Sequence, residues 1–139
     1  MNNGFPIDHL GIAVRSIEGA LKFYADTLGI PVMHRETVAH EQVNVAMLAA
    51  GESRLELLEP TAADSTIGKY LDKRGEGLHH IALRVPDLTL AAEKLKAAGS
   101  RILNEPRRGA GGHLYVFVHP SSTGGVLLEL IEDEQEHSL

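Results

Sequence analysis

The sequence predicts an α+β fold built from two tandem βαβββ modules whose strands form a curled mixed sheet. Three observations support this: an alternating strand pattern that occurs in each half, an amphipathic helix pattern after each of these strands, and a glutamate-bearing strand at the end of each half. With 139 residues, the chain fits one domain of ordinary size, residues 1–139. We place module 1 at about 7–60, a linker at 61–77 and module 2 at about 78–132.

The first strand of each half alternates large aliphatic residues with histidine and small residues. Residues 8–14 read DHLGIAV, and residues 79–85 read HHIALRV. Because successive side chains of a strand point to opposite faces, His9 and His80 are expected to lie opposite the aliphatic face of their strands. The phase of the alternation makes His80, rather than His79, the counterpart of His9.

An amphipathic helix is predicted after each of these strands, where it covers the aliphatic face of the sheet. The first helix pattern begins after Ser16, a residue type that favours the N-cap position, and ends at Gly29. The second begins after Asp87 and ends at Gly99. The linker is expected to contain a short helix near residues 67–73. The remaining strands are expected near residues 32–37, 42–48 and 54–58 in the first half and 101–103, 114–119 and 125–131 in the second.

The last strand of each half carries a glutamate between aliphatic residues, Glu56 in the first half and Glu129 in the second. The glutamates are 129 − 56 = 73 residues apart and the histidines 80 − 9 = 71 residues apart, so all four residues follow the repeat. Two imidazoles and two carboxylates are a typical ligand set for a first-row divalent ion, and a metal relieves the cost of burying two carboxylates together. We therefore predict that a divalent metal ion, Co, Mn, Zn or Ni, binds in a cleft enclosed by the curled sheet. Its predicted ligands are His9, Glu56, His80 and Glu129.

The other six of the eight histidines do not follow the repeat. A single histidine on a strand is more often a hydrogen-bonded structural residue than a metal ligand. We therefore interpret these residues as surface, supporting or tail residues: His34, His40, His79, His113, His119 and His137.

The composition excludes several classes of protein. A formal net charge of −6 argues against a nucleic-acid partner, since binding to a phosphate backbone requires clustered Lys and Arg. The absence of cysteine rules out a thiolate metal site. No apolar stretch approaches the roughly 20 residues of a membrane span. The start of the chain has neither a basic segment nor an apolar h-region, so we expect a cytoplasmic protein with no membrane partner.

Longer segments carry a resemblance to a known family: residues 8–14, 51–60, 73–81, 105–112 and 119–130. In these segments the chain resembles the vicinal oxygen chelate (glyoxalase/bleomycin resistance/dioxygenase) superfamily and, within it, the methylmalonyl-CoA epimerases. The superfamily resemblance extends from Ile7 to Glu132. The glycine-rich segment at residues 109–112 and the His-Pro-to-Glu segment at 119–129 are similar to the epimerases rather than to the glyoxalases.

The resemblance implies an enzyme that interconverts (2R)- and (2S)-methylmalonyl-CoA by removing and replacing the C2 proton through a metal-stabilised enolate. It places Glu41 at the position of one acid/base residue, although Val43 stands where the family often has glycine. Epimerisation needs a second acid/base residue on the opposite face of the enolate, and Glu129 is expected to fill that role while also binding the metal. The resemblance further implies an acyl-CoA substrate, no organic cofactor and a homodimer.

Two polar loops allow two interpretations each. Arg107 and Arg108, which precede the glycine-rich segment, either contact the coenzyme A phosphates or form a solvated charge pair on a hairpin loop. Residues 121–124 either hydrogen-bond the substrate carboxylate or form a plain polar turn.

Two alternative functions are compatible with the same pattern. The first is another metalloenzyme, a glyoxalase I-like lyase or an extradiol dioxygenase, although a fourth ligand at Glu56 would crowd the positions that an oxygenase keeps open. The second is a metal-free small-molecule-binding protein. Such proteins line their site with aromatic residues, and only 4% of this chain is aromatic.

Overall fold

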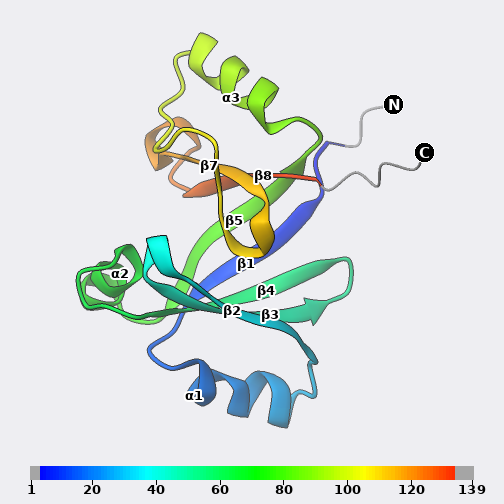
Figure 1. Cartoon of the computed structure of the whole chain (residues 1–139), viewed down its shortest axis with the longest axis vertical. Coiled ribbons are helices and arrows are strands. Elements are labelled where there is room, and N and C mark those ends of the chain that lie inside the picture. Colours follow the sequence, from blue (N-terminus) through cyan, green and yellow to red (C-terminus); the bar gives the residue numbers. More distant parts are fainter. Residues whose placement is uncertain (1–3, 134–139) are drawn as a thin grey trace. The chain divides into compact units, whose positions relative to one another are not determined.

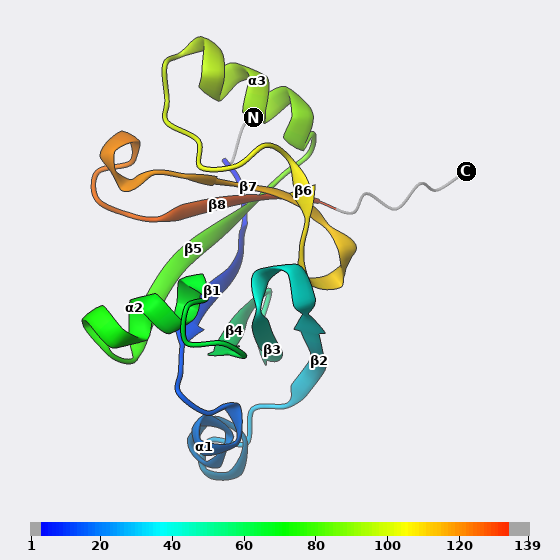
Figure 2. The same cartoon turned by 60° about the vertical axis from the view of Figure 1, so that its left-hand side comes forward.

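The computed structural model describes residues 4–133, which form eight strands connected by turns and short helices (Figure 1 and Figure 2). The chain divides into two compact units. The first unit consists of residues 9–79, and the second of residues 4–8 and 80–133. This mixture of helices and strands confirms the predicted α+β class, whereas the single domain and the module boundaries stay predictions. No helix in the described part of the chain is long and apolar enough to cross a membrane.

The first unit contains a mixed sheet in the order β2-β3-β4-β1. Its strands are β1 (Ile7–Ala13), which belongs to this unit from His9 onward, β2 (Val32–Val38), β3 (Val43–Ala50) and β4 (Ser53–Pro60). β1 runs parallel to β4, whereas β2 and β3, and β3 and β4, pair antiparallel. With a helix between β1 and β2, the unit has the predicted βαβββ order.

The helix between β1 and β2 begins where it was predicted but changes its type. α1 (Ile17–Leu21) continues directly as a π-helical segment, η1 (Lys22–Thr27). At its end the Leu28 amide donates to the Phe23 carbonyl at 2.9 Å, and Gly29 follows with a φ of 78°. The predicted apolar stripe holds as far as Tyr24, whereas Leu28, its last predicted residue, is 55% exposed after the π-helical segment.

This helix packs on one face of the first unit's sheet (Figure 1). Ile12 and Val14 of the first strand region belong to the apolar core there, as the alternation predicts, which leaves His9 and Ala13 on the opposite face of β1. The buried side chains of this core are Val14, Ile17, Ala46, Leu48 and Leu57, and Ile12, Leu21, Tyr24 and Leu55 pack against them.

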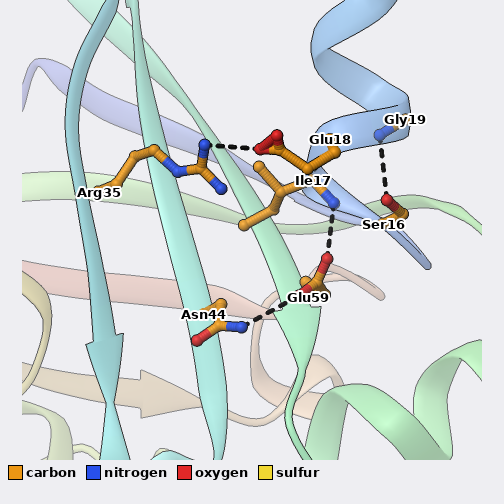
Figure 3. A network of polar contacts seen from close by, with 7 residues as sticks. All are labelled: Ser16, Ile17, Glu18, Gly19, Arg35, Asn44 and Glu59. Carbon is orange, nitrogen blue, oxygen red and sulfur yellow. Dashed lines mark hydrogen bonds and ion pairs between the residues drawn. The ribbon is translucent and has the colours of Figure 1, made fainter.

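Two side chains complete the N-terminus of α1 (Figure 3). The Ser16 hydroxyl accepts a hydrogen bond from the Gly19 amide at 3.0 Å, as predicted for an N-cap. Glu59, near the end of β4, accepts from the Ile17 amide at 2.8 Å and from the Asn44 side-chain amide at 3.0 Å. This carboxylate ties the helix to two strands and places a negative charge at the positive end of the helix dipole.

Replacing Glu59 with alanine is expected to lower the free energy of unfolding by about 1–2 kcal/mol, because the Ile17 amide and the Asn44 side chain lose their acceptor. Urea denaturation followed by circular dichroism measures this loss. Glu52→Ala, which removes an exposed carboxylate from the β3–β4 turn, is the control and should change stability by less than about 0.5 kcal/mol. Equal stability of Glu59→Ala and the wild type would show that this contact does not stabilise the unit.

The second unit contains a mixed sheet in the order β5-β8-β7-β6. Its strands are β5 (Gly77–Val85), which belongs to this unit from His80 onward, β6 (Arg107–Arg108), β7 (Leu114–Val118) and β8 (Leu128–Glu132). β5 runs parallel to β8, whereas β8 and β7, and β7 and β6, pair antiparallel. The strand pattern of the first unit is therefore repeated, as predicted.

The helix of the second unit, α3 (Leu88–Ala97), is capped from the sheet in the same way as α1. Glu132 of β8 accepts a hydrogen bond from the Leu88 amide at 3.1 Å. It lies 132 − 59 = 73 residues after Glu59, the same offset that separates the two glutamates of the predicted metal site. The core between α3 and its sheet contains the buried side chains Val85, Leu88, Ala92, Val116 and Leu130.

The predicted strand at residues 101–103 is confirmed only in part. Ile102 forms an isolated bridge to β7, and the edge strand is β6 instead. Asn104 explains the difference. Its side-chain amide donates to the Tyr115 carbonyl at 3.2 Å, and its side-chain oxygen accepts from the Phe117 amide at 2.8 Å. The main chain pairs here only through the Leu103 amide with the Phe117 carbonyl and the His119 amide with the Arg101 carbonyl, both at 2.8 Å, and the Asn104 side chain supplies the next two hydrogen bonds.

The predicted linker helix is present as α2 (Thr66–Arg74). Its N-cap is Ser65, whose hydroxyl accepts from the Gly68 amide at 3.0 Å and donates to the Ala62 carbonyl at 2.7 Å. A Cβ atom at Gly68 would lie 2.5 Å from the Ala63 carbonyl oxygen, so only glycine fits at this position. The helix is therefore held closely against the turn that precedes it.

Candidate metal centre

In the first unit, His9 and Glu56 form a buried pair. His9 lies on β1 and Glu56 on β4, and their exposed fractions are 1% and 6%. The Nε2 atom of His9 is 3.3 Å from the Oε1 atom of Glu56. The strand register places Glu56 beside Gly11 of β1 and Met47 of β3, on the sheet face that the helix does not cover.

In the second unit, His80 and Glu129 form the equivalent pair. His80 lies on β5 and Glu129 on β8, with exposed fractions of 4% and 7%, and Nε2 of the histidine is 3.0 Å from Oε1 of the glutamate. The register places Glu129 beside Ala82 of β5 and Phe117 of β7. The Phe117 ring packs edge-on against the His80 ring at a centroid distance of 5.2 Å, which restricts the orientation of the imidazole.

The two pairs have the same construction. In each unit the histidine lies two residues before the residue that faces the glutamate across the parallel strand pair, which is Gly11 in the first unit and Ala82 in the second. Both facing residues are small, and a small residue leaves space for the glutamate side chain to reach the imidazole. The sequence repeat therefore corresponds to a structural repeat, with one copy of the histidine–glutamate pair in each unit.

The separation of the donor atoms in each pair fits two ligands of one metal ion. Imidazole nitrogen and carboxylate oxygen bind divalent cations at about 2.0–2.2 Å, which puts neighbouring donors about 2.8–3.6 Å apart in octahedral or tetrahedral geometry. The observed separations are 3.3 and 3.0 Å. An ion pair without metal has similar distances, so the duplication and the burial of the donor set favour a metal more than the distances do.

Apolar and aromatic side chains surround the pair in the second unit. Ala82, Tyr115 and Ile131 are buried on this face, and Phe117 packs against them. The rings of Tyr115 and Phe117 contact each other edge-on at a centroid distance of 5.6 Å. Charges in such surroundings are screened less than at the surface, so a cation or a developing negative charge interacts more strongly there.

Glu41 belongs to the first unit but lies on a turn rather than on a strand. It ends η2 (Ala39–Glu41), a single 3-10 turn between β2 and β3, and it is half-buried. Its Oε2 atom is 3.8 Å from Nε2 of His40. Val43 is 3% exposed and begins β3, and the residue with positive φ is Gln42, at 54°. The turn thus uses position 42, and a valine at position 43 is accommodated in the sheet.

Most of the sequence that forms these two pairs matches a known family model. Residues 8–117 match the family model described as the Glyoxalase/Bleomycin resistance protein/Dioxygenase superfamily. The chain belongs to this superfamily. The matched range contains His9, Glu56 and His80, and the superfamily resemblance inferred from the sequence is confirmed.

Within the superfamily, this member is similar to methylmalonyl-CoA epimerases. The ethylmalonyl-CoA/methylmalonyl-CoA epimerase of Cereibacter sphaeroides is 36% identical to it, over 89% of this chain and 95% of the relative. A structure of a Streptomyces coelicolor methylmalonyl-CoA epimerase variant with 2-nitronate-propionyl-CoA has 41% identity and a TM-score of 0.89, covering 94% of this chain and 99% of that one. The uncharacterised protein YqjC of Bacillus subtilis is 44% identical over 91% of both chains.

Other histidines of this superfamily member have local contacts outside the two pairs. These contacts agree with their interpretation as surface or supporting residues. His137 lies outside the described residues, and His113 lies beside Gly111 in the glycine-rich loop. The contacts are His34 Nε2 with Glu36 at 2.8 Å, the His79 ring with the Tyr70 ring at 4.8 Å, and His119 Nδ1 with the Ser121 amide at 2.9 Å.

Both polar loops of this superfamily member are held by contacts within the second unit. Arg108 donates to the Gly112 carbonyl at 2.7 Å and so braces the glycine-rich loop. The Ser122 hydroxyl accepts from the Arg101 amide at 2.9 Å. Both loops thus have structural contacts of their own, and contacts of these loops with coenzyme A or a substrate carboxylate stay predictions.

Proposed function

We propose that this superfamily member is a metal-dependent methylmalonyl-CoA epimerase. The observation that carries the proposal is the buried His–Glu pair, which occurs once in each unit at equivalent register positions. The similarity to epimerases over most of the chain supports the choice of substrate. Methylmalonyl-CoA would be the small-molecule partner, and the active form would be a homodimer.

The two pairs are proposed to bind one divalent cation together. His9 and His80 would supply imidazole nitrogens, and Glu56 and Glu129 carboxylate oxygens, a set that accepts Co, Mn, Zn or Ni. The burial of all four side chains supports this assignment, because buried carboxylates are costly unless a cation neutralises them. A bound cation would supply Lewis-acid stabilisation of the negative charge that develops on the thioester oxygen.

Glu41 is proposed to exchange the C2 proton on one face of the substrate. The C2–H bond breaks, its proton moves to the Glu41 carboxylate, and the bonding electrons delocalise onto the thioester carbonyl. Glu129 would bind the cation through one oxygen and carry a proton on the other; this proton forms the new C2–H bond on the opposite face, which inverts the centre, and Glu129 takes up a proton from water before the next turnover. The reverse reaction exchanges the two roles. Because Glu41 is half-buried rather than enclosed, it can return its proton to solvent between turnovers.

Equilibration of a single epimer tests the proposed function. From pure (2S)-methylmalonyl-CoA, the purified protein is expected to produce a mixture of both C2 epimers. It is expected to form no lactoylglutathione from methylglyoxal and glutathione, whereas the glyoxalase alternative predicts the reverse pattern. Activity toward neither substrate by folded, metal-loaded protein would contradict the proposal.

Removal of metal by a chelator is expected to lower the melting temperature. A ligand that binds only the folded state stabilises it by about 3–4 kcal/mol when present at about 100 to 1,000 times its Kd. Differential scanning calorimetry should therefore show a lower Tm after EDTA treatment and recovery after excess Co²⁺ is added. A melting temperature that responds to neither treatment would contradict the proposed metal site.

A further inference from the structure

Gln42 adopts a backbone conformation that L-residues seldom adopt. Its φ of 54° and ψ of 49° lie in the left-handed region, and among residues 4–133 it is the one non-glycine residue with a positive φ. Glycine occupies this region freely, and asparagine and aspartate visit it, whereas other side chains are strained there. Such strain persists only where the surrounding structure enforces it, and it is concentrated at functional sites.

Contacts on both sides of Gln42 enforce its conformation. Its amide donates to the Ala39 carbonyl at 3.1 Å, which closes η2, and its carbonyl accepts from the Thr61 amide at 2.9 Å. Val38 and Val43, which flank the loop, face each other in the β2–β3 register and are both buried. The Gln42 side chain is exposed, so the conformation is a property of the backbone rather than of a buried side-chain contact.

We propose that left-handed Gln42 is a positioning residue for Glu41. The hydrogen bonds of Gln42 tie η2 to the end of β4, and they thereby fix the direction in which the adjacent Glu41 side chain leaves the backbone. A different φ at Gln42 would rotate the turn that carries the carboxylate. This inference rests on the proposed acid/base role of Glu41, because a misdirected carboxylate matters only if that group moves the proton.

The other hairpin of the same unit provides a matched control. Gly51, in the β3–β4 turn, has a φ of 64°, similar to that of Gln42. A β-branched residue is strained at either position for the same steric reason. Of the two residues, only Gln42 adjoins Glu41. A purely structural role of Gln42 therefore predicts that the two substitutions have similar effects on kcat, whereas a positioning role predicts that only the substitution at Gln42 lowers kcat.

The test compares Gln42→Val, Gln42→Gly and Gly51→Val at a temperature at which circular dichroism shows every variant folded. Gln42→Val should lower kcat for epimerisation by about 10- to 100-fold, with KM and metal content unchanged. Gln42→Gly should stay within about threefold of the wild type, because glycine adopts positive φ freely. Gly51→Val should lower Tm and leave kcat unchanged. If Gln42→Val does not fold, Thr61→Pro, which removes the amide that holds the Gln42 carbonyl, should lower kcat in the same way.

The inference is overturned if Gln42→Val, or Thr61→Pro in its place, has the same kcat as Gly51→Val. Glu41→Gln, measured in parallel, separates this result from a failure of the proposed function. If Glu41→Gln is inactive and the positioning variants are fully active, only the positioning role fails. If Glu41→Gln retains the wild-type kcat, the acid/base role of Glu41 fails and the positioning role fails with it.

Discussion

His80→Ala is expected to lose the bound metal and to lower kcat/KM for epimerisation by more than about 100-fold. The substitution removes a proposed imidazole ligand and takes away the Nε2 atom that lies 3.0 Å from Glu129. Because a buried carboxylate that loses its partner destabilises the fold, the melting temperature should fall as well. Metal content by inductively coupled plasma mass spectrometry and the epimer assay, on the same sample, measure both losses.

The adjacent histidine is the matched control for this experiment. His79 precedes His80 on β5 and therefore points to the opposite face, where its ring packs edge-on against Tyr70 at 4.8 Å. His79→Ala should retain metal and turnover. Full activity of His80→Ala at low metal content, or equal metal loss in both variants, would count against the assigned ligand.

Glu41→Gln is expected to retain its metal but to lose about 100- to 10,000-fold in kcat, the usual contribution of a general acid/base. Glutamine keeps the size of the side chain, but its amide does not accept the C2 proton at neutral pH. Metal binding should be unchanged, because Glu41 lies on the turn η2 and not on β1 or β4, the strands that carry His9 and Glu56. Steady-state kinetics and metal analysis of one preparation test both expectations.

Glu52→Gln is the control for Glu41→Gln, since Glu52 is an exposed carboxylate on the β3–β4 turn of the same unit. It should turn over substrate at the wild-type rate. Wild-type turnover by Glu41→Gln would remove Glu41 from the mechanism. Loss of metal from Glu41→Gln would instead place its carboxylate among the ligands.

The repeat of the candidate metal site could be predicted because side chains of a strand alternate with a period of two. Once Ile12 is assigned to the core face, His9 must lie on the other face, and the structure confirms this arrangement. The parallel pairing of β1 with β4, and of β5 with β8, then brings the histidine and glutamate of each half together. The similar offsets of the two histidines and of the two glutamates in the sequence reflect the same strand register in both units.

Features that depend on hydrogen bonds between side chains and the backbone could not be predicted in the same way. Asn104 replaces part of a strand ladder, and Glu59 and Glu132 cap helices from strands that are distant in sequence. The shared offset of 132 − 59 = 73 residues was a usable signal for the two caps, but a glutamate at a strand end is usually exposed. Gln42 gave no signal, because glutamine is not a residue type that favours positive φ.

Exchange of the C2 proton with solvent tests most directly whether this chain is a metal-dependent epimerase. Cobalt-loaded protein is mixed with (2S)-methylmalonyl-CoA in deuterated water, and the C2 proton is followed by NMR. We expect rapid loss of this signal, abolition of the loss by a chelator and its recovery when metal is restored. Folded, metal-loaded protein that exchanges the proton no faster than the buffer would contradict the proposed function.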